Sequence, residues 1–415
     1  MVGASVYDIW QKRRLGKLAR SLDTAVKLPH VTVLIPAHNE ETVIVRCLDS
    51  VFKSSYKSFD AMVINDASTD GTKQILKLYK KLHPDYDLQY INKNVNVGKG
   101  AALNSALRRY VRSELVMMLD ADSVLSPRAI ERAVSYFTDP LVVGVAANVQ
   151  IINEHTTLSV LQKFEHMIGY RSKKAYSITN SEFVVGGVAS TYRMDVIRAV
   201  GFYDTDTTTE DISLSMKIVA MGNKQNRIVY GADVMAMTEP VEDIRALFRQ
   251  RYRWKYGSLQ NLFKHNELIG KNDVRYSAML TIYRLPMAVI TEVALFLLPL
   301  TWGYALYLTL LEKSLALVIG AYLTVTLYVF LTLWHDEHIS FFERIYLSIY
   351  VPIIYFVFYI MDVIQILAMA HCLTKIRRLV RQDPAKSVWK SPVRIGGRVE
   401  FVPSVNGVDS RGRHD

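Results

Sequence analysis

The first 275 residues alternate short apolar runs with longer amphipathic stretches. Four runs have the length and composition of buried strands, and helical spacing follows the first three. The strands are predicted at 31–35, 61–64, 88–92 and 115–119, and the helices at 42–52, 72–82 and 101–110. Strands that alternate with helices of this length indicate βαβ units and a largely parallel sheet.

Polar side chains follow these strands at the point where each one ends. Ligands of open α/β sheets bind outside the carboxyl ends of the strands, so we expect these side chains to meet at one edge. They are Pro36, Asn39 and Glu40 after the first strand, Asp66 after the second, Lys99 after the third, and Asp120 and Asp122 after the fourth. No Gly-x-Gly-x-x-Gly follows the first strand, so a dinucleotide site is not indicated.

Asp120 and Asp122 flank a single alanine at the end of an apolar run. Two carboxylates with this spacing offer hard oxygen ligands to Mg²⁺ or Mn²⁺, and such a cation is usually shared with substrate phosphates. A solvated turn is the alternative interpretation of the same pair.

The chain continues with a strand pattern over 141–151, a helix over 158–178 and an apolar stretch over 183–193. Gly186 and Gly187 in that stretch permit close approach of the backbone to a sugar or a phosphate. A strand with a bulge explains the same residues equally well.

The next helix opens within residues 207–212. Thr208 or Thr209 is suited to cap it, and acidic Glu210 and Asp211 suit the first turn of a helix dipole. The functional alternative makes Asp211 a general base at the mouth of the site.

A longer helical pattern over 242–264 carries the run Arg249-Gln250-Arg251-Tyr252-Arg253-Trp254. Three arginines and a tryptophan within six residues suit an amphipathic helix at a membrane interface. They also suit phosphate donors beside an aromatic platform for a sugar ring.

Three later stretches are long and apolar enough to cross a hydrocarbon core, which takes about 20 residues. They are 283–311, 314–334 and 345–371. Three crossings would put the basic residues of 375–381 opposite the first 275 residues, whereas the positive-inside rule places them in the cytoplasm. A re-entrant, split or interfacial segment would remove this conflict, and Pro286, Pro299 and Pro352 are candidate break points.

Glu292 and Asp362 lie inside these apolar stretches. Intramembrane carboxylates are costly, and they usually face a polar path or pair with a neighbouring polar side chain. A polymer channel is one such path, and both interpretations stay open.

The net charge of +11 is explained by basic residues beside the apolar segments. No zinc spacing, RNA-binding aromatic signature or helix-turn-helix pattern points to a nucleic-acid partner. Residues 4–22 form a basic amphipathic pattern, suited either to an anionic membrane surface or to packing on the domain. Cys47 and Cys372 cannot support a disulfide framework, and a cleavable signal peptide is not expected.

Four motifs occur in order along the chain: the loop with Asp66, Asp120-Ala121-Asp122, Thr209-Glu210-Asp211, and Gln250 to Trp254. Followed by apolar helices, this order resembles the membrane-integrated, processive family-2 glycosyltransferases, which include cellulose, hyaluronan, chitin and poly-N-acetylglucosamine synthases. The resemblance covers about 31–371. Residues 96–104 look most like the bacterial poly-β-1,6-N-acetylglucosamine synthase branch.

The resemblance implies an α/β, GT-A (Rossmann-like) domain followed by a C-terminal transmembrane helical region. It implies inverting, processive transfer of a sugar, with N-acetylglucosamine expected, from a UDP-sugar to a growing β-linked polysaccharide. Transfer would take place at the cytoplasmic face of the cell membrane, with export through the membrane region. The lipid bilayer and a small accessory membrane subunit are the further expected partners.

Carried over to this sequence, the resemblance makes Asp211 the base that deprotonates the acceptor hydroxyl. Asp120 and Asp122 would face the diphosphate, and Mg²⁺ or Mn²⁺ would be held chiefly by Asp122. The other expected substrate-binding residues are Pro36, Asn39, Glu40 and Asp66 for the uridine, Gln250, Arg253 and Trp254 for the diphosphate and acceptor sugar, and Lys99, Gly187 and Glu210.

Together these inferences divide the chain into five parts. They are a basic amphipathic segment (1–29), a GT-A catalytic domain (30–240), interfacial helices with the Gln-x-x-Arg-Trp motif (241–277), a transmembrane region of about three helices with a further interfacial helix as an option (278–373) and a basic polar tail (374–415). Many relatives begin with one or two transmembrane helices, whereas this chain offers only the amphipathic stretch. No Phe-x-Val-Thr-x-Lys gating loop is present, so regulated cellulose synthesis is less expected.

Two other functions are compatible with the sequence. The enzyme could add a single sugar to a lipid, either ceramide-type or polyprenyl phosphate, although polyprenyl-phosphate transferases generally lack a Gln-x-x-Arg-Trp motif. The chain could also be an inactive membrane scaffold, which the intact set of Asp66, Asp122, Asp211 and Trp254 argues against.

Overall fold

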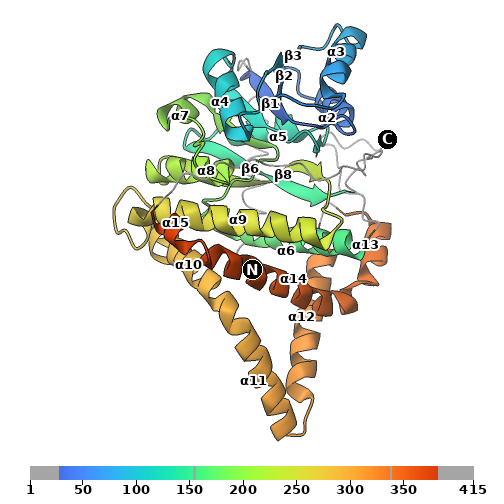
Figure 1. The fold of residues 1–415 in the computed structure, drawn as a ribbon, viewed down its shortest axis with the longest axis vertical. Coiled ribbons are helices and arrows are strands. Elements are labelled where there is room, and N and C mark those ends of the chain that lie inside the picture. The colour runs from blue at the N-terminus through green and yellow to red at the C-terminus, as the bar shows by residue number, and fades with distance from the viewer. Residues whose placement is uncertain (1–27, 153–155, 337–338, 382–415) are drawn as a thin grey trace, which may run out of the picture.

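A computed structural model of the chain describes residues 28–152, 156–336 and 339–381 (Figure 1). The amphipathic helix expected at 4–22 and most of the polar tail from 374 lie outside these residues. Within them, a mixed sheet with helices on both faces stands above a layer of long helices, and two further helices project from that layer.

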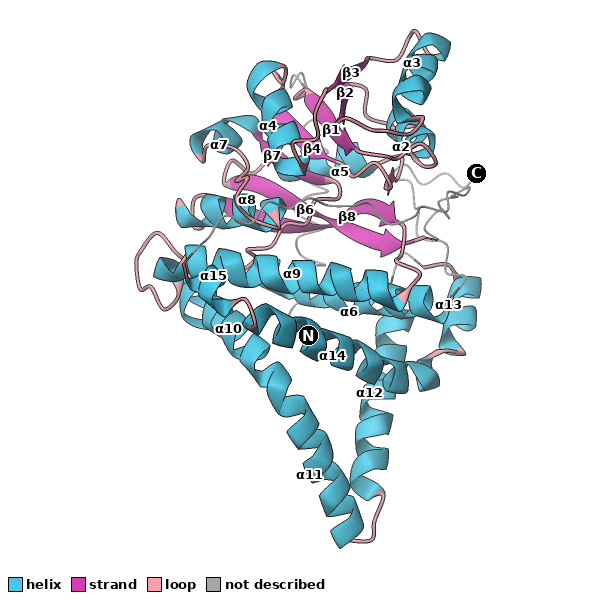
Figure 2. Ribbon diagram, viewed as in Figure 1, coloured by secondary structure: helices cyan, strands magenta, loops and turns pink. Residues whose placement is uncertain are grey.

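Eight strands form one sheet in the order β3-β2-β1-β4-β7-β6-β8-β5 (Figure 2). They are β1 (Val31–Ala37), β2 (Phe59–Asn65), β3 (Leu88–Asn92), β4 (Leu115–Met118), β5 (Val124–Leu125), β6 (Val142–Ile151), β7 (Ser190–Arg193) and β8 (Arg227–Thr238). The first four pair in parallel, as expected, but β7 is antiparallel to both β4 and β6. The prediction of a largely parallel sheet therefore holds for the half formed by β1 to β4, whereas the other half is mixed.

The apolar stretch predicted over 183–193 is only partly a strand. Residues 183–189 form a loop, and β7 begins at Ser190. Strands β5 and β8 were not expected from the sequence pattern. β8 pairs in parallel with β6, and a register shift after Gly231 marks an irregularity in the ladder.

Two apolar cores cover the two faces of the sheet, because alternate residues of a strand point to opposite sides. Val33 and Ile35 of β1 belong to one core, whereas Leu34 belongs to the other. The first core is covered by α2 (Ile44–Phe52), α3 (Thr72–Leu82) and α5 (Ala129–Tyr136). The second is covered by α4 (Lys99–Arg109), α7 (Met194–Ala199) and α8 (Glu210–Ala220).

Three long helices lie side by side below the sheet (Figure 1). They are α6 (Thr157–Ile178), α9 (Ile244–Lys264) and α14 (Val351–Leu373). Apolar residues of all three meet in a separate cluster, with Leu161 from α6, Leu247 from α9 and Ile354 from α14. The apolar helix α14 is therefore packed into the same layer as α6 and α9.

The remaining helices form a helical hairpin that leaves the domain and then returns to it. A continuous helical segment, Met279–Leu311, contains α10 (Leu285–Ala294) and α11 (Leu298–Leu311), and α12 (Ala316–Trp334) follows the turn. The short helices α13 (Phe341–Ser348) and α15 (Ile376–Val380) flank α14. Three segments are long and apolar enough to cross a membrane: Met279–Leu311, Ala316–Trp334 and Val351–Leu373.

Pro286 and Pro299 appear as changes of helix type within one helical segment, whereas Pro352 lies at the start of α14, after a break that separates it from α13. Pro286 follows a π-helical turn, Met279–Arg284, and Pro299 follows a 3₁₀ turn, Leu295–Leu297. Each proline lies at the start of the next α-helix, where its missing N–H is tolerated.

Helix α9 is fixed to α8 by a close approach at Gly257. A Cβ on this residue would meet the hydroxyl and the methyl group of Thr209, the residue before α8. The side-chain amide of Asn261 also donates to the Thr209 hydroxyl (3.1 Å) and carbonyl (3.4 Å). The two helices therefore have one preferred spacing.

We expect Gly257→Ala to destabilise the protein by about 1–3 kcal/mol, because the added methyl group overpacks this contact. Thermal unfolding in detergent should show a Tm lower by several degrees. Gly303→Ala is the matched control, since Gly303 lies in α11 with open space around it. Alanine favours a helix by about 0.5–1 kcal/mol over glycine, so the control should be neutral or slightly stabilised. Equal losses in both variants would contradict the close approach.

Candidate active site

The centre of the site is the ammonium group of Lys99 at the start of α4. Its Nζ donates to Asp120 Oδ1 at 2.6 Å and lies 3.4 Å from Glu210 Oε1. Burial alone would lower the pKa of Lys99, but Asp120, Glu210 and Asp211 together raise it well above its usual value. Lys99 is therefore a permanent cation among three carboxylates that come from the end of β4 and the start of α8.

Asp66 fixes the loop that leads into Lys99. Its carboxylate is buried and accepts hydrogen bonds from the backbone N–H groups of Val97 (3.1 Å) and Gly98 (2.8 Å). Gly98 has a φ of 85°, a left-handed conformation that glycine adopts without strain. In this structure Asp66 thus braces the N-terminus of α4, while its expected contact with uridine stays a prediction.

The loop after β1 is fastened to the loop after β2. The Asn39 side-chain oxygen accepts from Thr69 N (2.8 Å), and the Asn39 N–H donates to the Ser68 hydroxyl (3.0 Å). The N–H of Glu40 donates to the Thr72 hydroxyl (3.0 Å). Pro36 still belongs to β1, one residue before it ends. These bonds build one continuous rim at the carboxyl ends of β1 and β2.

The turn after β4 buries Asp122. The Ser123 hydroxyl donates to Asp122 Oδ1 at 2.9 Å, and only 8% of the residue is exposed. Asp122 is therefore not part of a solvated turn, and that alternative interpretation is wrong. Sequence reasoning also missed Arg46 and Glu239. A guanidinium nitrogen of Arg46 donates to the Asp122 carbonyl (3.2 Å) and to Glu239 Oε1 (2.8 Å), which ties this turn to α2 and to the end of β8.

Gly187 leaves room for the charged side chains of the site. A Cβ at this position would lie 2.8 Å from Lys99 Nζ, 3.6 Å from Asp120 Oδ2 and 3.7 Å from Asp211 Oδ2. Any larger residue would displace the lysine. The sequence signal was the Gly186-Gly187 pair, but only the fold shows that the close approach is made by side chains of the site itself.

Asp211 lies in the first turn of α8. Thr209 occupies the capping position, but its side chain makes no capping bond and instead accepts from Asn261. The expected threonine side-chain cap is therefore absent, whereas Glu210 and Asp211 do lie in the first turn of α8, as the helix-dipole interpretation expects. Burial, with the neighbouring charge of Glu210, raises the pKa of Asp211 to about 6, although Lys99 and Arg253 act in the opposite direction. A carboxylate with this pKa is ionised at neutral pH and is a stronger base than an exposed aspartate.

The Gln250–Trp254 run divides its side chains between two tasks. Arg251 is buried, donates to Glu165 Oε2 of α6 at 2.6 Å, and stacks on the Trp254 ring at 4.4 Å. Arg253 lies close enough to Asp211 to lower its pKa. The side-chain oxygen of Gln250 is buried and accepts no hydrogen bond from the described residues. Arg251 thus holds α9 on α6, and sequence reasoning missed this role.

The donor set fits a divalent cation that is shared with a ligand. Among the described residues, no group of three or more His, Cys, Asp or Glu side chains could hold a metal ion. Asp120 is engaged by Lys99, which leaves Asp122 as the principal carboxylate of the pair. Mg²⁺ and Mn²⁺ are often bound by one or two carboxylates together with substrate phosphates. The residues present therefore suit a cation that arrives with a phosphorylated substrate.

Comparison with known proteins connects this site to sugar transfer. Residues 32–201 match the family model Glycosyl transferase family 2. Poly-beta-1,6-N-acetyl-D-glucosamine synthase from Staphylococcus epidermidis is 28% identical over 267 residues, which is 64% of this chain and 63% of the relative. The synthase of the same name from Staphylococcus aureus (strain COL) is 28% identical over 264 residues, covering 63% and 62%. The chain thus matches somewhat less than two thirds of the length of these relatives.

A solved structure shares the fold over most of its length. The mannosyltransferase PcManGT from Pyrobaculum calidifontis, in complex with GDP-Man and Mn²⁺, superposes with a TM-score of 0.57 at 21% sequence identity. The match covers 89% of this chain and 95% of that one. The expected GT-A domain followed by a helical region with candidate membrane spans is confirmed.

We expect Lys99→Met to lower stability by about 1–3 kcal/mol at pH 8, because a partly buried cluster of carboxylates loses its cation. The loss should shrink at pH 5. Repulsion among the remaining carboxylates raises their pKa values, so protonation at lower pH relieves the strain. Lys77→Met, at an exposed position of α3, is the control and should change stability by less than about 0.5 kcal/mol. Thermal unfolding at both pH values measures this, and a pH-independent loss would contradict the cluster.

Proposed function

We propose, from the glycosyl transferase family 2 domain that this chain contains, that the protein is an inverting glycosyltransferase which uses a nucleotide-diphosphate sugar. One observation carries this proposal. The base candidate Asp211, the Lys99 ammonium and the Asp120–Asp122 turn converge around Gly187 at the carboxyl edge of the sheet. This brings a base and groups suited to a diphosphate into one place, in a domain of the matching family.

The reaction follows from these positions as a single displacement. A hydroxyl oxygen of the acceptor forms a bond to the anomeric carbon, while the bond from that carbon to the diphosphate oxygen breaks. The diphosphate leaves with the electron pair, and Asp211 takes the hydroxyl proton. Attack from the face opposite the leaving group inverts the anomeric centre, so no enzyme nucleophile is needed.

Charge that develops on the diphosphate needs fixed positive groups nearby. Arg253, which acts electrostatically on Asp211, and Lys99 are suited to this task. A divalent cation held chiefly by Asp122 would add Lewis-acid stabilisation of the leaving group. Asp120 orients Lys99 through their 2.6 Å ion pair, and the buried oxygen of Gln250 offers an acceptor for a donor group of the substrate.

The related synthases support UDP-N-acetylglucosamine as donor and a growing β-linked polysaccharide as acceptor. We place the reaction at the cytoplasmic face of the cell membrane, with the bilayer as a partner. A membrane glycosyltransferase that makes a single-sugar glycolipid is the second candidate. One observation favours it: no residue of α11 is buried, so within the described residues the α11–α12 hairpin encloses no path for a polymer.

An inactive scaffold is disfavoured by the buried charges. Asp66 and Asp122 are nearly inaccessible, and Glu210 lies within reach of Lys99 in a largely buried cluster. Buried charges cost stability unless they are paired, and a chain that only anchors partners gains nothing from them.

We expect purified protein in nanodiscs to release UDP from UDP-N-acetylglucosamine in the presence of Mg²⁺ or Mn²⁺. Asp211→Asn should slow release by about 10²–10⁴-fold, the usual contribution of a general base. Asp85→Asn, the same change at an exposed site, is the control and should have no effect. A chelator should stop release, and added Mn²⁺ should restore it.

The product separates the two candidate acceptors. Long polymer supports polysaccharide synthesis, whereas a lipid with one added sugar supports the glycolipid. UDP-glucose and UDP-glucuronic acid are tested in parallel, so that the assay also identifies the sugar that is transferred. Equal release by Asp211→Asn and the parent protein would overturn the assignment of the base.

We further expect the kcat/KM profile to fall as pH drops through about 6, because protonated Asp211 cannot accept the hydroxyl proton. Glu210→Gln removes a neighbouring negative charge that raises the pKa of Asp211. The acid limb should therefore move to lower pH in this variant. Removal of Lys99, whose charge lowers the same pKa, should move the limb to higher pH. If the acid limb moved in the same direction in both variants, the assignment of Asp211 as the base would be contradicted.

A further inference from the structure

The hairpin leaves the catalytic part and returns to it. Near its start, Glu292 of α10 pairs with Lys255 of α9 at 2.7 Å. This carboxylate therefore has a polar partner on a helix of the domain, as the pairing interpretation expects. The membrane segment Met279–Leu311 thus begins at the level of α9, and its distal part projects away from the domain (Figure 1).

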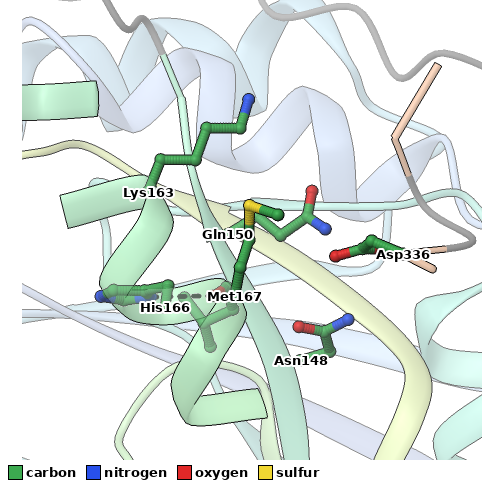
Figure 3. Close-up of a pocket in the computed structure, with 7 residues that line it drawn as sticks. Asn148, Gln150, Lys163, His166, Met167 and Asp336 are labelled. Carbon is green, nitrogen blue, oxygen red and sulfur yellow. Dashed lines mark hydrogen bonds between the residues drawn. The ribbon is translucent and has the colours of Figure 1, made fainter. Parts of the chain in front are cut away.

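The end of α12 comes back to the same side. Asp336, two residues after α12, lines a small pocket with Asn148 and Gln150 of β6 and with Lys163 and His166 of α6 (Figure 3). The Lys163 ammonium also forms an ion pair with Glu343 of α13. The chain has therefore returned to the domain before α14 begins.

Helix α14 then stays against the domain along its length. Its first half packs into the cluster shared with α6 and α9 through Val351 and Ile354. At its end, the ring of His371 lies 4.7 Å from the Tyr252 ring, and Lys375 Nζ donates to the Tyr252 hydroxyl at 2.9 Å. Helix α9, which carries Tyr252, is itself bonded to the loop before α8. A helix that follows α9 in this way cannot leave the domain to cross a bilayer.

The surface of α14 is divided into stripes. One stripe is buried against the domain and includes Ile354, Met361, Ile364, Ala368 and Cys372. A neighbouring stripe of large apolar side chains is about half exposed: Ile353, Phe356, Ile360, Val363 and Leu367. The exposed stripe is therefore free to contact lipid while the opposite face stays packed on the domain.

Asp362 supports the same orientation. It is the twelfth of the 23 residues of α14, and it makes no hydrogen bond or ion pair with any described residue. A crossing helix would hold this unpaired carboxylate at the bilayer centre, where it is most costly. A helix parallel to the surface keeps it at the depth of the polar headgroups.

We propose that the described part of the chain crosses the membrane twice, through Met279–Leu311 and Ala316–Trp334, and that α14 lies flat on the leaflet that faces the catalytic domain. Its exposed stripe contacts the lipid of that leaflet. The basic residues of 375–381 then remain on the domain's side, where anionic headgroups attract them. Two crossings remove the conflict between three apolar stretches and the positive-inside rule. The inference rests on the proposed membrane location but not on the proposed chemistry.

The side on which the tail lies tests the number of crossings. Single cysteines are introduced at Lys77 in α3, Glu312 at the hairpin tip and Arg377 after α14, all exposed positions. The native Cys47 and Cys372 are buried, so the parent chain gives the background. Whole cells are treated with a membrane-impermeant maleimide before and after permeabilisation.

We expect Glu312→Cys to label in intact cells, and Lys77→Cys and Arg377→Cys to label only after permeabilisation. Labelling of Arg377→Cys together with Glu312→Cys would show three crossings and overturn the proposal. UDP release is measured on the same variants. Loss of the expected activity with this labelling pattern would refute the proposed function while leaving the topology intact.

Depth measurements test the orientation of α14 directly. Phe356→Cys and Leu367→Cys carry a fluorophore on the exposed stripe, and lipids spin-labelled at different depths quench it. A helix in the interface should give both positions the same depth, whereas a crossing helix would separate them by about 16 Å. Leu317→Cys and Leu327→Cys on α12 are the matched control, expected to differ by about 15 Å. A depth difference on α14 as large as that on α12 would overturn the proposal.

Discussion

The ammonium group of Lys99 is the one charge on which the site depends. It neutralises carboxylates that arrive from two directions, Asp120 from the end of β4 and Glu210 with Asp211 from the start of α8. Without it, like charges would be held together in a partly buried space, which is strongly unfavourable. Its position is in turn set by Asp66, which accepts two backbone N–H groups at the entry to α4. Asp66, which does not contact the carboxylate cluster in the described contacts, therefore sets the position of the cation at its centre.

Helix α9 couples the candidate site to the apolar helices. On one side, α9 meets the loop before α8, where Gln260 and Asn261 bind backbone and hydroxyl groups of residues 206–209. On another side it carries α14, and through Lys255 it holds the start of the hairpin. Any displacement of the apolar helices thus reaches the first turn of α8, where the proposed base Asp211 lies. If these helices are embedded in a bilayer as proposed, the same contacts would fix the distance between Asp211 and the membrane surface.

The sequence predicted what depends on local spacing. Apolar runs located the first four strands within two residues at each end, and the convergence of Asp66, Lys99 and Asp120 followed from the rule that parallel strands end at one edge. It did not predict contacts between distant elements. Arg46 and Glu239 are 193 residues apart, and Arg251 pairs with Glu165 across two helices. The periodicity of a sequence does not show which distant residues pair. Strand β8, which positions Glu239, also has no regular alternation of polar and apolar residues from which it could be predicted.

Hydropathy alone does not distinguish a crossing helix from one that lies along the membrane surface, because it measures how apolar a segment is and not which direction it takes. Val351–Leu373 is as apolar as Ala316–Trp334, and both reach the length of a span. What separates them is their surroundings: α12 buries only three residues near its end, whereas α14 buries seven along its whole length. Packing energy gained against α6 and α9 would be lost if α14 turned into the bilayer, where lipid offers no hydrophobic advantage over a protein partner. The direction of an apolar helix is therefore decided by the helix it packs on, and here that helix belongs to the catalytic site.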